Sequence, residues 1–97
     1  PLGRSEVPFS VEVNNNNNNI IISGKIDRLL IEDDIITAID FKTDKYPPDN
    51  QNLVRQEYIE QMQDYAKALR IIFPGKKILC GLLFTTNASM IWIDVVS

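Results

Sequence analysis

Two runs of strand-forming residues, separated by a short acidic turn, constrain the fold of this chain more than any other feature. Residues 20–31 and 35–43 are rich in isoleucine, leucine and other apolar residues, and Glu32-Asp33-Asp34 lies between them. Such runs favour buried, pleated strands over helix, so they predict an antiparallel hairpin. With a two-residue turn, the expected cross-strand pairs are Glu32 with Ile35, Leu29 with Ala38, and Asp27 with Asp40.

The predicted register places two carboxylates opposite each other, on Asp27 and Asp40. Directly opposed side chains have Cβ atoms about 4.5–5.5 Å apart, so like charges at such positions repel each other. A divalent cation would offset this repulsion, because hard cations bind carboxylate oxygens together with water and phosphate. Lys42 lies two residues beyond Asp40 and therefore projects from the same face of the strand.

The same four charges allow a simpler interpretation. Lys25 and Lys42 are expected on the face that carries Asp27 and Asp40, and an alternating ladder of solvated ion pairs would look the same in the sequence. A turn of three or four residues would also shift the register. The residues alone therefore leave both a metal site and a solvated surface open.

Several motifs in a fixed order add a resemblance to a known family. The segments that carry it are Gly24-x-Ile26-Asp27-Arg28, Ile39-Asp40-Phe41-Lys42-Thr43 and Gln61-x-x-x-Tyr65, with Ser5-Glu6-Val7-Pro8, Tyr46-Pro47-Pro48 and Phe73-Pro74-Gly75-Lys76 around them. Together they resemble the PD-(D/E)xK nuclease superfamily. Within it, they look most like the C-terminal nuclease domain of AddA- and RecB-type helicase–nucleases, and especially bacterial AddA.

The resemblance implies a metal centre built from oxygen ligands. In this family pattern Asp27 and Asp40 would hold Mg²⁺, for which Mn²⁺ can substitute, and the Phe41 carbonyl would be a further ligand. Glu6 matches a glutamate of the pattern and is a candidate for an additional metal or water ligand. Relatives often carry a histidine ligand well upstream, and this chain has no histidine. We therefore expect an N-terminally truncated fragment that binds metal weakly by itself.

The resemblance also assigns the catalytic lysine and its surroundings. Lys42 would orient or deprotonate the attacking water and neutralise charge on the phosphate. Gln61 would contact DNA or order a catalytic group, with Tyr65 as a further candidate beside it. Gln61 and Tyr65 are one helical turn apart, so they can act on one object.

The function implied by the resemblance is Mg²⁺-dependent hydrolysis of DNA by an exonuclease-type deoxyribonuclease. The domain would belong to an ATP-binding bacterial helicase–nuclease that works in the cytoplasm on double-strand breaks, in repair and recombination. Its expected partners are DNA, helicase domains of the same chain and a second helicase–nuclease subunit. One alternative is a non-catalytic, nuclease-like module for binding to DNA or to a partner protein. Another is a scaffold domain unrelated to nucleases.

Composition limits the remaining classes of function. The 97 residues allow one small domain, residues 1–97, and no apolar run is long enough to span a bilayer. The absence of histidine excludes Ser-His and Cys-His catalysis, and the lone Cys80 excludes an internal disulfide. Cys80 lies in an apolar run and is expected to be a buried, inert thiol. The net charge of −3 argues mildly against a free-standing nucleic-acid binder.

The fold class expected is α/β, with a restriction-endonuclease-like mixed sheet and one crossover helix. The apolar stripe of the helix is Leu53, Tyr58, Met62, Tyr65, Leu69 and Ile72, with Ala66 beside it, and the candidate helix caps are Asp49, Asn50 and Asn52. Gly24 is expected to leave room for DNA or metal-bound water. The expected elements are strand 7–13, an asparagine loop at 14–19, strands 20–31 and 35–43, loop 44–52, helix 53–72, strand 77–85 parallel to 35–42, and edge strand 89–95.

Overall fold

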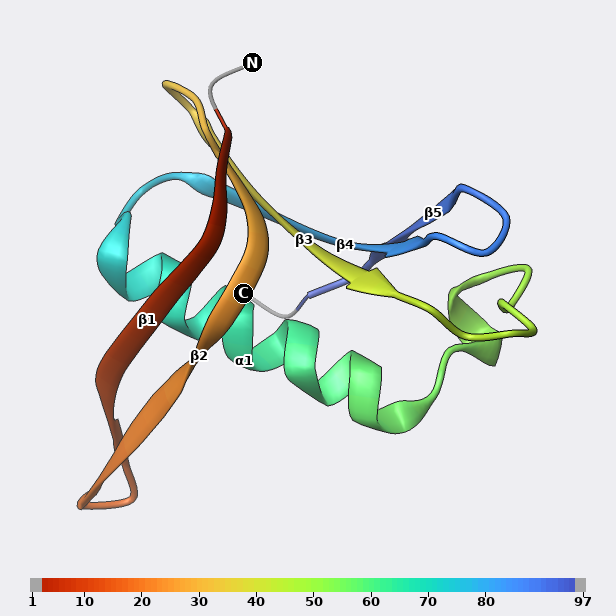
Figure 1. Cartoon of the computed structure of the whole chain (residues 1–97). Coiled ribbons are helices and arrows are strands. Elements are labelled where there is room, and N and C mark those ends of the chain that lie inside the picture. Colours follow the sequence, from red (N-terminus) through yellow and green to blue (C-terminus); the bar gives the residue numbers. More distant parts are fainter. Residues whose placement is uncertain (1–2, 96–97) are drawn as a thin grey trace.

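A five-stranded sheet with one long helix packed across it makes up the part of the chain that the computed structural model describes, residues 3–95 (Figure 1). The elements in chain order are β1 (Gly3–Asn15), β2 (Asn18–Ile31), β3 (Ile35–Lys42), η1 (Gln51–Leu53), α1 (Gln56–Ile72), β4 (Lys77–Phe84) and β5 (Ser89–Ile93). The strands follow each other across the sheet in the order β1-β2-β3-β4-β5.

The sheet is mixed, as predicted. β1, β2 and β3 are antiparallel neighbours, β4 runs parallel to β3, and β5 returns antiparallel at the far edge. A parallel pair needs a crossover connection, and α1 supplies it between β3 and β4. The restriction-endonuclease-like arrangement of one crossover helix on a mixed sheet is therefore confirmed.

The register of the β2–β3 hairpin is also as predicted, up to one point. The ladder pairs Leu29 with Ala38 and continues to Arg28 with Ile39, where it ends. Asp27 and Asp40 would be the next pair in this register, but the ladder does not extend to them, so their direct cross-strand pairing stays a prediction. The β2–β3 ladder thus ends directly before the two aspartates.

The asparagine run forms a tight turn instead of the loop predicted over residues 14–19. β1 continues to Asn15 and β2 starts at Asn18, so only Asn16 and Asn17 connect them. Both turn residues have positive φ, 51° and 68°. Two-residue hairpin turns of this kind need positive φ at both positions, and asparagine tolerates that conformation better than most residues.

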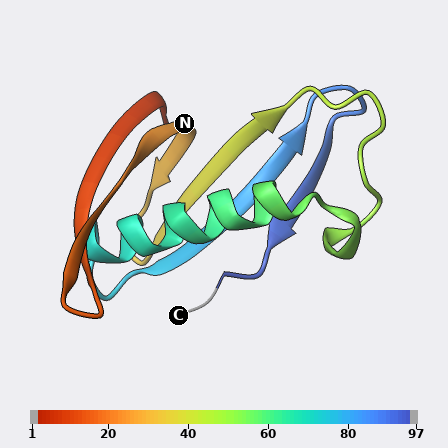
Figure 2. The same cartoon turned by 90° about the horizontal axis from the view of Figure 1, so that it is seen from below.

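α1 packs its apolar face against one side of the sheet (Figure 2). The buried helix residues are Met62, Tyr65, Ala66, Ala68 and Leu69. The predicted apolar stripe is wrong at both ends, because Leu53 is 63% exposed and Ile72 is 43% exposed. No helix in residues 3–95 has both the length and the apolar character needed to cross a membrane.

The start of the helix differs from the prediction. Leu53 belongs to the short 3-10 helix η1, and α1 begins at Gln56. Asn50 does act as a cap, but for η1, where its Oδ1 accepts a hydrogen bond of 2.9 Å from the Asn52 amide. The predicted end of the helix at residue 72 is confirmed, and Gly75 just beyond it adopts a φ of 81°, which glycine reaches without strain.

Only one face of β3 is covered by a helix within the described residues. β3 is the middle strand of the sheet, as predicted, and its helix-facing side chains are buried. Phe41 points to the opposite face and is 45% exposed, and Trp92 on β5 is 51% exposed. The single long helix therefore covers one side of the sheet within residues 3–95.

Candidate active site

β3 delivers Asp40 and Lys42 to the face of the sheet that α1 covers. The Lys42 ammonium lies 2.7 Å from Asp40 Oδ2, and both side chains are largely buried, at 14% and 7% exposure. The alternation of a strand places residues i and i+2 on one face, so this proximity follows directly from the Asp-x-Lys spacing. Burial raises the pKa of Asp40, while the bond and charge of Lys42 lower it.

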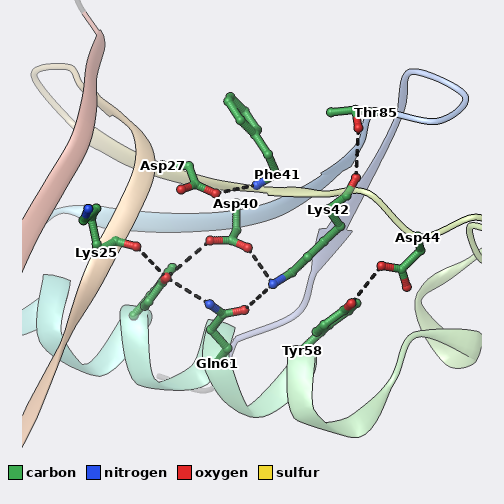
Figure 3. A network of polar contacts seen from close by, with 10 residues as sticks. Lys25, Asp27, Asp40, Phe41, Lys42, Asp44, Tyr58, Gln61 and Thr85 are labelled. Atoms are coloured by element: carbon green, nitrogen blue, oxygen red, sulfur yellow. Dashed lines mark hydrogen bonds and ion pairs between the residues drawn. The ribbon is translucent and has the colours of Figure 1, made fainter.

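Asp27 reaches the same place from β2. Its Oδ2 accepts a hydrogen bond of 2.8 Å from the backbone N–H of Phe41, in the region where the β2–β3 ladder has ended (Figure 3). The charge of Asp27 acts on Asp40 and contributes to the rise of its pKa. The two carboxylates therefore interact with each other.

α1 adds Gln61 and Tyr65 to the cluster. Gln61 Oε1 accepts a hydrogen bond of 2.9 Å from Lys42, and Gln61 Nε2 donates one of 3.0 Å to the Tyr65 hydroxyl. That hydroxyl lies 2.8 Å from the Lys25 carbonyl and 3.3 Å from Asp40 Oδ1. Burial, followed by the charge of Asp40, raises the pKa of Tyr65, which keeps its hydroxyl protonated.

Tyr58 and Asp44 also belong to this cluster, although neither was predicted from the sequence to have a site role. The Lys42 ammonium lies 4.2 Å from the centroid of the Tyr58 ring, and the Tyr58 hydroxyl donates a hydrogen bond of 2.8 Å to Asp44 Oδ1. Burial and the bond to Asp44 raise the pKa of Tyr58. One signal was available, since Tyr58 precedes Gln61 by three residues and therefore shares its helix face.

Gly24 allows two aromatic rings to approach the backbone of β2 closely. A Cβ at this position would lie 3.2 Å from the Phe9 ring and 3.5 Å from the Tyr65 ring. Phe9 and Tyr65 pack edge to face, with ring centroids 5.4 Å apart. Gly24 also lines an open pocket together with Phe9 and Tyr65, so the expectation that it leaves room for DNA or water stays a prediction.

Glu6 does not join the carboxylate pair. It lies on β1, where its side chain is 75% exposed and forms an ion pair of 3.8 Å with Lys25. Within residues 3–95, no three acidic, histidine or cysteine side chains come close enough together to bind one metal ion. The acidic side chains that the fold brings together beside Lys42 are therefore Asp27 and Asp40.

Cys80 lies apart from this chemistry. It is buried in β4 with 1% exposure, as predicted from the sequence. Burial raises the pKa of its thiol to about 12. Because the thiolate is the reactive form, this cysteine has the properties of a core residue.

Comparison with known proteins places this geometry in a family. Residues 2–92 match the PD-(D/E)XK nuclease superfamily. A Listeria monocytogenes protein, named as the A subunit of an ATP-dependent helicase/nuclease, is 32% identical over 97 residues, covering 86% of this chain. A protein of the same name in Streptococcus suis is 40% identical over 63 residues, covering 65% of this chain. The chain spans only 8% and 5% of the lengths of these relatives.

A solved structure supports the fold independently. The crystal structure of SSO0001 superposes with a TM-score of 0.64 over 98% of this chain and 43% of that one, at 19% sequence identity. Similarity at this identity shows a shared fold and nothing more specific. The match over residues 2–92 and the identity with the Listeria monocytogenes protein establish that this chain belongs to the PD-(D/E)XK nuclease superfamily.

Proposed function

We propose that this domain hydrolyses phosphodiester bonds of DNA with the help of a divalent metal ion. The observation that carries the proposal is the contact of Lys42 with Asp40 at 2.7 Å, beside Asp27, on a buried face of the sheet. A surface ladder of solvated charges would not explain the burial. Taking an ammonium and a carboxylate out of water is costly, and the attraction between them often does not repay that cost.

The donor set suits Mg²⁺. Two carboxylates, from Asp27 and Asp40, lie next to each other, and the Phe41 carbonyl is proposed as a third oxygen ligand. Mg²⁺ is usually held by one or two carboxylates, with water and substrate phosphates completing its shell. When bound, such an ion polarises the scissile phosphate and lowers the pKa of a water molecule.

The protein's own groups would orient the reactants. Lys42 has an ammonium group that can contact both the attacking water and the phosphate, and thereby neutralise developing charge. Gln61 and Tyr58 fix the position of that ammonium from α1. The Tyr65 hydroxyl lies beside Asp40 Oδ1, so it holds this carboxylate in orientation.

The wider assignment rests on the names of the relatives. We propose that the chain is one nuclease domain, residues 1–97, of a bacterial ATP-dependent helicase–nuclease that acts on DNA ends, with helicase domains in the same protein and a second subunit. The net charge of −3 fits such an arrangement, because a domain with few basic residues would rely on neighbouring parts for most phosphate contacts.

A second candidate is a nuclease-like module without catalysis. The observation that favours it is that Asp40 already uses both carboxylate oxygens, one for Lys42 and one for Tyr65. In this case the cluster would serve stability alone. The two candidates differ in what they predict for Asp27, whose carboxylate accepts a backbone hydrogen bond and, among the residues described, forms no ion pair within 4 Å.

The test is cleavage of linear DNA during titration with Mg²⁺ and with Mn²⁺. We expect Asp27→Asn and Asp40→Asn each to reduce cleavage by about 100-fold or more, the scale of removing one preorganised electrostatic contact. Asp34→Asn, in the exposed β2–β3 turn, is the matched control and should leave cleavage unchanged. Cleavage that survives both site substitutions would eliminate the proposed centre, whereas absence of cleavage by the wild type with either metal would favour the non-catalytic module.

A further inference from the structure

A pocket of about 230 Å³ opens beside the Lys42 cluster, on the side of the loop that follows β3. Its walls include Asp44, Tyr46, Pro48, Leu53, Arg55 and Tyr58. Ligand pockets for larger molecules usually exceed about 300 Å³. The size therefore suits a single planar ring system better than several linked groups.

Tyr58 connects this pocket to the candidate active site. Its ring lines the pocket and also lies 4.2 Å from the Lys42 ammonium. The Arg55 guanidinium lies 5.6 Å from the centroid of the same ring. A phosphate held by Lys42 would therefore have its neighbouring nucleotide within reach of the pocket.

The pocket presents apolar side chains that the fold does not use. Tyr46 is 83% exposed and Leu53 is 63% exposed, and neither belongs to the core. The loop that carries Tyr46 is nevertheless held in place, because Thr86 Oγ1 donates a hydrogen bond of 2.6 Å to the Asp44 carbonyl. Pro47 and Pro48 further restrict its backbone.

The charges around the pocket favour a neutral ligand over a phosphate. Arg55 is 3.6 Å from Asp44 and 3.6 Å from Glu57, so its charge is already offset by two carboxylates. Lys45 lies over the Tyr46 ring at 5.5 Å and adds a cation at the rim. Nucleobases are planar and uncharged, and each stack of a base on an aromatic side chain contributes about 1–3 kcal/mol.

We propose that this pocket binds the unpaired base of the nucleotide next to the scissile phosphate, with Tyr46 as the stacking surface. This inference rests on the proposed function, since it takes DNA as the ligand of the neighbouring cluster. A base that is paired and stacked inside a duplex cannot enter a pocket of this kind. The site therefore selects single-stranded substrate at the position of cleavage.

The test measures binding without cleavage. A fluorescently labelled oligothymidylate is titrated with the protein in EDTA, and its anisotropy gives Kd. We expect Tyr46→Leu to weaken binding by about tenfold, the lower part of the range for losing one stack. Tyr46→Phe keeps the ring and should retain wild-type affinity. Trp92→Leu removes another exposed aromatic, outside the pocket, and should change nothing.

A second oligonucleotide tests whether the base is the group that the pocket binds. On an oligomer of the same length with abasic sugars throughout, wild type and Tyr46→Leu should bind equally, and the same equality is expected on duplex DNA. Equal affinity of wild type and Tyr46→Leu for oligothymidylate would overturn the proposal. So would an equal loss on the abasic strand, or failure of the wild type to bind oligothymidylate. Because this binding assay requires no cleavage, the pocket proposal and the catalytic proposal, which the Asp40→Asn cleavage assay tests, can fail independently.

Discussion

Two ammonium–tyrosine contacts lie close together in this chain, and they differ in almost every respect except chemistry. Lys42 lies 4.2 Å from the Tyr58 ring and has only 14% of its side chain exposed. Lys45 lies 5.5 Å from the ring of Tyr46, which is 83% exposed. Cation–π contacts contribute about 0.5–1 kcal/mol when exposed and about 2 kcal/mol when desolvated. The surroundings decide what each contact does.

The difference arises from the backbone that carries each lysine. Lys42 is the last residue of β3, so the alternation of the strand directs it to the face covered by α1, where Asp40 and Gln61 are its polar partners. Lys45 follows the strand and lies in a loop at the surface. A buried ammonium needs hydrogen-bond acceptors or counter-charges from the protein, whereas a surface ammonium is solvated by water. Lys42 is therefore held in one position, and Lys45 is not.

The largest expected difference between the two lysines is in catalysis. Lys42→Met should reduce the rate of DNA cleavage by about 100-fold or more, because a positioned group that handles a proton or developing charge contributes on this scale. Lys45→Met is the matched substitution and should change the rate by less than a factor of about three, consistent with the small value of exposed charges. Single-turnover cleavage of linear DNA measures both. Similar rates for the two variants would remove Lys42 from the mechanism.

A smaller effect, on the free energy of unfolding, is expected when the hydrogen-bond network around Lys42 is weakened. Tyr65→Phe removes a hydroxyl that contacts Gln61 and the Lys25 carbonyl. Leaving buried polar groups without partners costs about 1–3 kcal/mol, so the free energy of unfolding should fall by that amount. Tyr46→Phe removes an exposed hydroxyl and serves as the control. Urea denaturation measures both variants, and equal stabilities would show that the Tyr65 hydroxyl carries no structural role.

The two ring contacts can be compared directly by removing each ring. Tyr58→Leu should lower the free energy of unfolding by about 2 kcal/mol, the value of a desolvated contact, and Tyr46→Leu by at most about 0.5 kcal/mol. Tyr58→Phe keeps the ring and loses only the bond to Asp44, so its loss should be intermediate. A double-mutant cycle of Tyr58→Leu with Lys42→Met isolates the contact. A coupling energy near zero would show that the contact between the Tyr58 ring and Lys42 does not stabilise the fold.

The smallest effect is a pH dependence that comes from Asp40. Burial raises its folded pKa above the ordinary value of 3.8. Between the unfolded and the folded pKa, the folded protein therefore keeps a proton that the unfolded chain has released. The resulting stability is complete below the unfolded pKa and is lost as pH rises through the folded pKa. In metal-free buffer, the stability of wild type relative to Asp40→Asn should fall across that window. Thermal unfolding at several pH values tests this. If the stability of wild type relative to Asp40→Asn rises with pH, the pKa of Asp40 is lowered by folding and not raised.

The elements that the sequence predicted correctly depend on short-range patterns. The β2–β3 register follows from the acidic turn and from the alternation of apolar residues, and the ladder matches it from Ile31 to Arg28. The parallel placement of β4 follows from the length of the connection. The proximity of Asp40 and Lys42 requires nothing beyond a strand with residues on alternate faces. Such relations are local, so they need no knowledge of how the sheet twists.

Other features of the site region depend on contacts between distant segments. The ladder opens before Asp27, so this carboxylate binds the Phe41 amide, a contact that no spacing rule predicts. Leu53 leaves the helix and becomes part of an exposed pocket wall. Gly24 accommodates the Phe9 and Tyr65 rings because β1 and α1 meet there. Each result needs two segments that are distant in the sequence to be placed first.

The sequence by itself therefore determined which residues are the candidates for catalysis: an Asp-x-Lys strand, a second aspartate on the preceding strand, and a glutamine–tyrosine pair on a helix. Only the tertiary structure decided how they meet. The position of α1 on the sheet sets Gln61 and Tyr58 against Lys42, and it leaves Tyr46 free beside them. Local alternation and helical period are encoded over a few residues, whereas the docking of a helix on a sheet depends on the packing of the whole core.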